Sequence, residues 1–253
     1  MQQFDDLKDH IVAGLVYGSY QRDIDLLILV EDSDRNRLDR IKRILQTISQ
    51  EENKPVDPDI KTLEDFLDRV ICQDYYILSV LNTTRFYICG EDVFENARSG
   101  ISSRVPDKNS IEFNLREGLS ILDFAYFMLE CFRFSLRESS SNTLELSLYK
   151  RLVLDQTLID GIPPSSEQLY YINQAVRNGV FSISYLAAVR RMINGALTDY
   201  NYLCSTPGEF PEDFLFKRGK GLIEEYKNGG RIKHSTASLF LKEVSAAYES
   251  FQF

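Results

Sequence analysis

The stretch that decides the fold is residues 16–28, which read VYGSYQRDIDLLI. An apolar segment at 11–16 leads into the pair Gly18-Ser19, and a second apolar segment at 24–30 follows after a short connection. Short apolar runs that are rich in aliphatic residues and bounded by turn residues are typical of strands. The pattern therefore predicts two adjacent strands that are joined tightly.

Two acidic residues, Asp23 and Asp25, stand at the start of the second segment. Residues two apart on a strand project from the same face, so their carboxylates are expected to point together and to share a hard cation. Phosphoryl transfer uses such cations to bridge phosphate oxygens and to offset developing charge. Gly18 lets a backbone approach phosphate closely, and Ser19 adds a hydroxyl and an amide as donors. A hairpin turn beside two solvated acids is the alternative interpretation of the same residues.

The segments that follow predict further elements of an α+β arrangement. Residues 55–61 indicate a short extended segment, residues 62–66 a capping box that opens a helix, and residues 85–90 a last short strand. A polar stretch at 96–109 with a glycine, a proline and several serines indicates a linker. Between the hairpin and residue 55, apolar residues at helical spacing predict an amphipathic helix through Leu38, Ile41, Ile44, Leu45 and Ile48.

A strand, then Gly-Ser, then Asp-x-Asp on the next strand resembles the signature of the nucleotidyltransferases of the DNA polymerase β superfamily. That superfamily includes small antibiotic nucleotidyltransferases and minimal archaeal and bacterial members. The resemblance implies a third acid on a later strand, for which Asp59 fits best and Asp57 is the fallback on the same face. The segment 81–92 is similar to the short strand followed by glycine that often ends the minimal domain.

The resemblance also implies roles for single residues. Arg22 beside the acids is expected to contact a phosphate, although simple charge balance explains it equally well. The implied catalytic and metal-binding residues are Asp23, Asp25 and Asp59, which would hold Mg²⁺ or Mn²⁺. The implied nucleotide-binding residues are Gly18, Ser19 and Arg22.

One departure from the family pattern concerns the loop between Gly18-Ser19 and Asp23. Only the three residues Tyr20, Gln21 and Arg22 intervene here, where family members carry a longer phosphate-contacting loop. Two alternatives follow: a shortened but active variant, or a nucleotide site that is altered or lost.

The second half of the chain has a helical pattern throughout. The fold class expected is α+β, with a nucleotidyltransferase-like domain containing a mixed sheet at 1–98 and an all-α helical bundle at 110–253. Asn178-Gly179, Pro207-Gly208 and Gly229-Gly230 are expected to break the helices. The predicted helices are 111–138, 144–159, 165–177, 183–203, 214–226 and 235–251.

Composition and charge narrow the classes of protein. The net charge of −9 argues against nonspecific binding of nucleic acid, and no apolar run is long enough to cross a bilayer. The acidic N-terminus is unlike a signal peptide, so a cytoplasmic protein is expected. The four cysteines form no C-x-x-C pair and the two histidines lie far apart, which disfavours a zinc site. A basic cluster over 217–233 is interpreted as a solvated surface, with phosphate or RNA binding as the alternative.

The function expected is transfer of a nucleoside monophosphate from a nucleoside triphosphate to an unidentified acceptor, with the helical bundle closing over the nucleotide. The acceptor is a small molecule, a protein or a tRNA, and no membrane partner is expected. The alternative is a catalytically silent module that binds a nucleotide or a protein. A homo-oligomer is compatible with the sequence, which does not determine the oligomeric state.

Overall fold

The computed structural model describes residues 4–21, 23–138, 165–194 and 210–251. The chain divides into an N-terminal unit, which runs to Phe113, and a helical unit, which begins at Asn114. Together they confirm the α+β class, with a mixed sheet first and a helical bundle after it.

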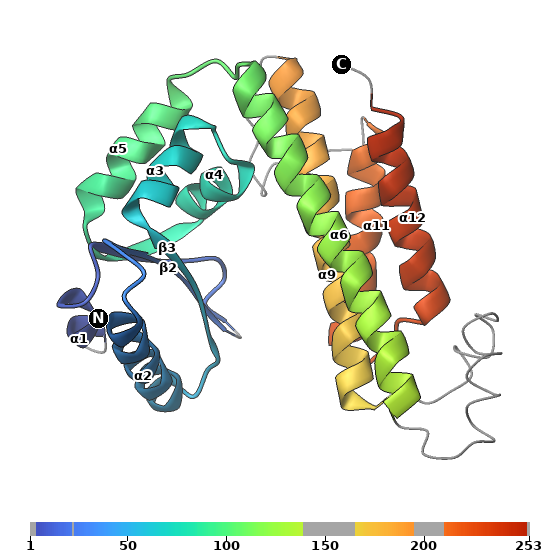
Figure 1. The fold of residues 1–253 in the computed structure, drawn as a ribbon, viewed down its shortest axis with the longest axis horizontal. Coiled ribbons are helices and arrows are strands. Elements are labelled where there is room, and N and C mark those ends of the chain that lie inside the picture. Colours follow the sequence, from blue (N-terminus) through green and yellow to red (C-terminus); the bar gives the residue numbers. More distant parts are fainter. Residues whose placement is uncertain (1–3, 22, 139–164, 195–209, 252–253) are drawn as a thin grey trace. The chain divides into compact units, whose positions relative to one another are not determined.

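A four-stranded mixed sheet organises the N-terminal unit (Figure 1). Its strands are β1 (Ala13–Tyr17), β2 (Ile24–Val30), β3 (Val56–Thr62) and β4 (Thr84–Cys89), in the order β3-β2-β1-β4. Strand β1 pairs antiparallel with β2 and with β4, which confirms the predicted hairpin. Strand β3 pairs parallel with β2 at the edge of the sheet. The extended segment and the last short strand were therefore also predicted in the right places.

Helices cover both faces of this sheet, because β2 is apolar on both of its sides. On one face, α2 (Arg35–Glu52) packs against Leu26, Ile28 and Val30 together with the short α1 (Asp5–Lys8). On the other face, Leu27 and Leu29 pack against a second set of helices. These helices are α3 (Leu63–Ile71), α4 (Tyr75–Asn82) and α5 (Glu91–Ser102).

The ends of the helices follow local sequence signals in part. Thr62 caps α3, since its hydroxyl oxygen accepts a hydrogen bond from the Asp65 backbone N–H at 3.1 Å, which is one half of the predicted capping box. The predicted linker at 96–109 is wrong for its first part, because α5 continues to Ser102. Phe94, Ala97 and Ile101 are buried along that helix, so its polar composition conceals one apolar stripe that packs on the sheet.

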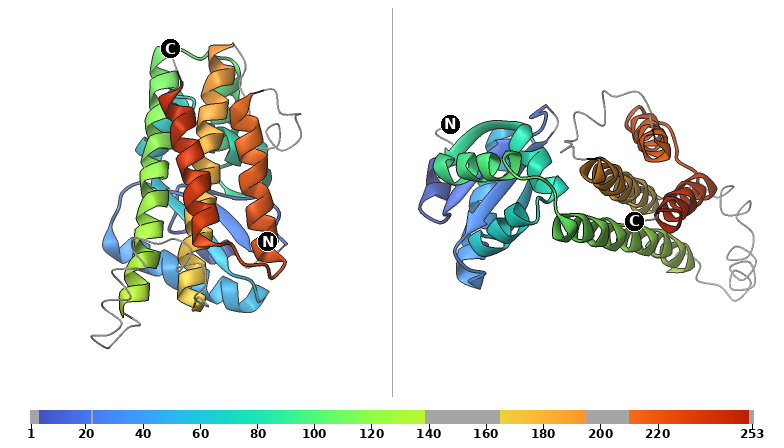
Figure 2. Two further views of the ribbon diagram at one scale, coloured as in Figure 1. Left: turned by 90° about the vertical axis from the view of Figure 1, so that its right-hand side faces the viewer. Right: turned by 90° about the horizontal axis from the view of Figure 1, so that it is seen from above.

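Four long helices form the described part of the helical unit (Figure 2). They are α6 (Lys108–Glu138), α9 (Ser166–Ile193), α11 (Pro211–Lys227) and α12 (His234–Glu249). The helix predicted at 144–159 lies outside the described residues. No described helix is both long enough and apolar enough to cross a membrane.

The predicted helix break at Asn178-Gly179 is wrong, because α9 is continuous through both residues. A Cβ atom at Gly179 would lie 2.5 Å from Leu241 Cδ2 and 2.8 Å from Phe240 Cε1 of α12. Gly219 of α11 stands equally close, 2.6 Å from Phe240 Cζ. These glycines admit neighbouring side chains to the helix surface, so close packing and not chain termination explains their presence.

The packing role of Gly219 predicts the effect of adding one methyl group. Gly219→Ala should destabilise the helical unit by about 1–3 kcal/mol, because the new Cβ would lie 2.4 Å from Val180 Cγ2. Gly221→Ala in the same helix meets nothing within 4 Å and should stabilise the unit by up to about 1 kcal/mol through helix propensity. Urea unfolding followed by circular dichroism measures both changes. Equal effects of the two substitutions would contradict the packing role.

Candidate functional site

The parallel pairing of β2 with β3 determines which acidic side chains lie together. Asp25 pairs with Asp57, and Leu27 pairs with Asp59. Paired residues on neighbouring strands point to the same face, as do residues two apart on one strand. Asp25, Asp57 and Asp59 therefore lie on one face, the face that α3, α4 and α5 cover further along. We call these three residues the carboxylate face.

The remaining predicted site residues lie elsewhere or outside the described residues. Asp23 is half-buried and precedes the first residue of β2, so no strand register places it beside Asp25. Arg22 is outside the described residues. Both candidates for the third acid, Asp59 and Asp57, share the face of Asp25, and Asp57 is the direct register partner.

The glycine–serine pair forms the turn that leaves β1, beside Asp25. Gly18 has φ +72°, and a Cβ at this position would lie 2.6 Å from Asp25 Oδ2, so only glycine fits there. Its backbone N–H donates to the Thr83 carbonyl oxygen at 3.2 Å. Arg85 Nε donates to the Gly18 carbonyl oxygen at 2.7 Å. Because the Gly18 amide is engaged, the donors that this turn offers to a phosphate come from the exposed Ser19.

Tyr20, the first residue of the shortened connection, is held against the end of α2. Tyr20 adopts a left-handed backbone with φ 55°, and its hydroxyl donates to Glu52 Oε2 at 3.4 Å. Lys54 Nζ donates to the Tyr20 carbonyl oxygen at 3.0 Å and lies 4.4 Å from the centroid of its ring. Tyr20 is therefore fixed by contacts to Glu52 and Lys54.

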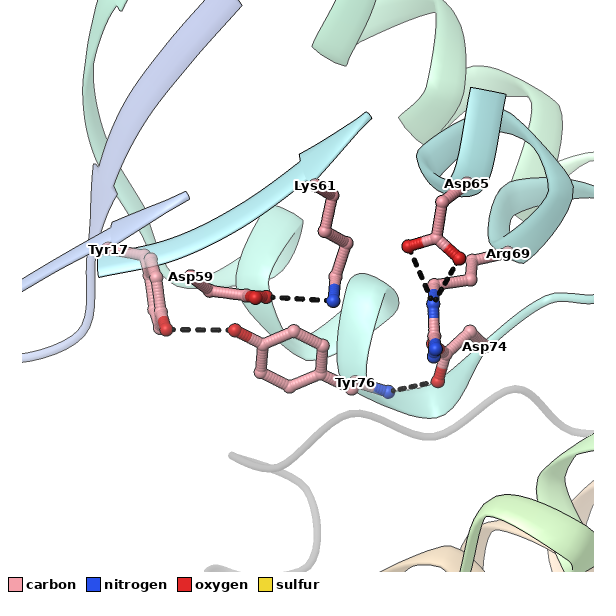
Figure 3. A network of polar contacts seen from close by, with 7 residues as sticks. All are labelled: Tyr17, Asp59, Lys61, Asp65, Arg69, Asp74 and Tyr76. Carbon is pink, nitrogen blue, oxygen red and sulfur yellow. Dashed lines mark hydrogen bonds and ion pairs between the residues drawn. The ribbon is translucent and has the colours of Figure 1, made fainter. Parts of the chain in front are cut away.

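Two tyrosine hydroxyl groups border the carboxylate face. The hydroxyl oxygens of Tyr17, at the end of β1, and Tyr76, in α4, lie 2.9 Å apart (Figure 3). Burial raises the pKa of the Tyr17 hydroxyl, and the hydrogen bond with Tyr76 partly opposes this shift. The negative charges of Asp25, Asp59 and Asp57 raise the pKa of Tyr17 further. Burial, with a smaller contribution from the three carboxylates, therefore keeps this phenol neutral.

Tyr76 is neutral for similar reasons. Burial raises the pKa of its hydroxyl most, and the neighbouring Tyr17 and Asp59 raise it further. Asp74 and Arg69 hold the start of α4, and thereby Tyr76, in place. The Asp74 side chain accepts a hydrogen bond from the Tyr76 backbone N–H at 2.9 Å and is ion-paired with Arg69 Nη1 at 2.8 Å (Figure 3).

Lys61 supplies a positive charge to the carboxylate face. Its Nζ lies 3.2 Å from Asp59 Oδ2 and 5.7 Å from the centroid of the Tyr76 ring (Figure 3). The Lys61 side chain is only 14% exposed. Partial burial strengthens the attraction between the ammonium and carboxylate groups, so Lys61 compensates part of the negative charge of this face.

The carboxylate face has donor atoms that suit a hard divalent cation. Its oxygens are carboxylate oxygens, which Mg²⁺ and Mn²⁺ prefer. Asp59 Oδ2 is shielded from solvent, and Lys61 Nζ approaches it to 3.2 Å without the geometry of a hydrogen bond. No set of three or more acidic, histidine or cysteine side chains within the described ranges is arranged to hold a metal ion. Convergence of Asp23, Asp25 and Asp59 on a cation therefore stays a prediction.

Four residues of this site were not predicted from the sequence: Tyr17, Lys61, Tyr76 and Arg85. Lys61 and Tyr17 were detectable, because Lys61 lies two residues after Asp59 and Tyr17 lies directly before Gly18. Tyr76 and Arg85 come from α4 and β4, and no short-range signal in the sequence connects them to the carboxylates.

Comparisons with protein-family models, with curated proteins and with solved structures gave no significant match. The chain is therefore described by its own architecture, a mixed four-stranded sheet with helices followed by a helical region.

The raised pKa values of Tyr17 and Tyr76 predict how stability responds to alkaline pH. An unfolded tyrosine ionises near pH 10, whereas both phenols stay protonated in the folded chain, so stability is retained below about pH 10 and falls above it. Each phenol should contribute a loss of about 1.4 kcal/mol per pH unit above that point.

Urea unfolding of the wild type and of the double variant Tyr17→Phe/Tyr76→Phe, at about pH 9 and about pH 11, measures this loss. The variant should lose less stability than the wild type between the two pH values. An identical loss would show that these phenols are not held neutral by the fold.

Proposed function

We propose that the N-terminal unit is a nucleotidyltransferase, which moves a nucleoside monophosphate from a nucleoside triphosphate to an acceptor. One observation carries the proposal: Asp25, Asp57 and Asp59 share one face of the sheet, beside the glycine–serine turn that leaves β1. Like charges repel, so three carboxylates on one face favour a bound cation, since the ammonium of Lys61 compensates only part of their charge. The resemblance of the strand, Gly-Ser and Asp-x-Asp arrangement to the polymerase β superfamily supports the same reaction.

The residues of this unit suit distinct parts of that reaction. Asp25, with Asp59 or Asp57 and with Asp23, would hold Mg²⁺ or Mn²⁺, which when bound would bridge phosphate oxygens and offset their charge. The amide and hydroxyl of Ser19 would donate to the phosphates. Arg22 stays the predicted further phosphate contact.

The chemistry itself is an exchange of one phosphorus–oxygen bond for another. The acceptor oxygen forms a bond to the α-phosphorus, the bond from that phosphorus to the bridging oxygen breaks, and pyrophosphate leaves. The proton of the acceptor hydroxyl passes to a carboxylate of the carboxylate face. The acceptor class stays open between a small molecule, a protein and a tRNA.

A second candidate is a module that binds a nucleotide or a partner protein without transfer. One contact favours it: Lys61 Nζ lies 3.2 Å from Asp59 Oδ2. An ammonium group beside Asp59 offers the carboxylate a partner other than a metal ion.

The proposal predicts the result of removing one charge from the carboxylate face. Asp25→Asn should lower transfer by at least roughly a hundredfold with the fold intact, because it keeps the side-chain shape and removes a charge that the metal needs. Asp68→Asn on α3 is the matched control, since Asp68 is exposed and lies outside the carboxylate face. Comparing Asp57→Asn with Asp59→Asn identifies the third acid.

The assay incubates the protein with each labelled triphosphate, Mg²⁺ and candidate acceptors, which include its own chain and tRNA. Calorimetry of triphosphate binding runs in parallel. Binding that requires Mg²⁺ and Asp25 without transfer would favour the silent module. Absence of both binding and transfer would overturn the proposed function.

A further inference from the structure

A pocket of about 140 Å³ lies between α9 and α11 of the helical unit. Its apolar walls come from Val180, Phe181 and Ile223. Val180 and Ile223 are buried, whereas the Phe181 ring is 41% exposed. The volume is close to that of an engineered cavity of about 150 Å³ that holds one benzene molecule. The pocket therefore has room for an apolar group the size of a single ring.

Three cationic side chains line the same pocket: Arg177 of α9, and Lys220 and Lys227 of α11. Arg177 stands four residues before Phe181, and Lys220 stands seven before Lys227, so each helix presents its residues on one stripe. Glu224 compensates part of this charge, since Lys227 Nζ lies 2.9 Å from its Oε1. Arg177 has no acidic partner among the described residues.

At the opposite end of the interface between α9 and α11, the arginine side chains are ion-paired with acidic residues. There Arg190 and Arg191 of α9 pair with Glu212 and Asp213 of α11, with nitrogen–oxygen distances of 2.6 and 2.7 Å. At the pocket end, Lys220 and Lys227 of α11 line the same pocket as Arg177 of α9. Like charges repel, and this concentration occurs in a chain whose net charge is −9.

We propose that this pocket binds a small anion that carries one aromatic ring, with a phosphate group facing the cations and the ring against Phe181. Arg177 would supply paired N–H donors to phosphate oxygens, which suit the guanidinium fork. The exposed face of Phe181 offers a stacking surface for the ring. The three cationic side chains outnumber Glu224, so the pocket is net positive and suits a dianion better than a monoanion. The site is independent of the proposed transfer, because every residue that lines it belongs to the helical unit.

Calorimetry with four probes tests the two halves of this proposal at low salt, where surface electrostatics are least screened. Phenyl phosphate carries both the ring and the dianion, benzoate a ring and a single charge, benzyl alcohol a ring alone and inorganic phosphate the anion alone. Phenyl phosphate should bind with a Kd of about 1 mM or lower. The other three probes should bind roughly tenfold more weakly or not at all.

Variants of exposed residues assign the binding to this pocket without disturbing the core. Arg177→Met should weaken phenyl phosphate binding by about tenfold through loss of charge-assisted hydrogen bonds. Phe181→Ala should weaken it by about fivefold through loss of aromatic contact. Lys242→Met is the matched control, because Lys242 is an exposed cation of α12 that does not line the pocket.

Three results would overturn the proposal. They are no binding of phenyl phosphate, equal binding of phenyl phosphate and inorganic phosphate, and equal losses in the Arg177→Met and Lys242→Met variants. Circular dichroism of each variant verifies that the helices are intact.

Discussion

The parallel pairing of β2 with β3 is the constraint on which the N-terminal unit depends. Strand β2 is apolar on both faces, so it is stable only with helices on each side and strands along each edge. The pairing from Ile24 with Val56 to Val30 with Thr62 supplies one of these edges. The same register brings Asp25, Asp57 and Asp59 to one face, so the packing of the core and the geometry of the carboxylates have a common cause.

The negative charge of the carboxylate face is balanced or bordered by side chains from several strands and one helix. Lys61 of β3 lies beside Asp59, and Arg85 of β4 holds the turn at Gly18 through its carbonyl oxygen. The phenols of Tyr17 and Tyr76 stay neutral, and so they add polar groups without adding charge. Side chains from β1, β3 and α4 thus border the acids, and Arg85 of β4 holds the adjoining turn.

The helical unit uses small residues and buried charges in place of a sheet. Gly179 and Gly219 let Phe240 approach α9 and α11 closely. Arg191 and Asp213 form a nearly buried ion pair between the same two helices, and removing either partner would leave an uncompensated charge inside the unit. At the other end, the ion pair between Lys227 and Glu224 joins two residues of α11, in contrast to these pairs between two helices.

The sequence by itself determined the α+β class, the hairpin, the capping of α3 by Thr62 and the strand positions of Asp25 and Asp59. These features depend on neighbours a few residues apart, because alternation, caps and turn residues act locally. Only the tertiary structure decided that Asp57 is the register partner of Asp25, that Tyr76 reaches Tyr17 while Arg85 reaches the turn at Gly18, and that α9 continues through Gly179. Those outcomes depend on contacts between distant segments, and a glycine that terminates a helix looks the same in sequence as one that lets two helices pack closely.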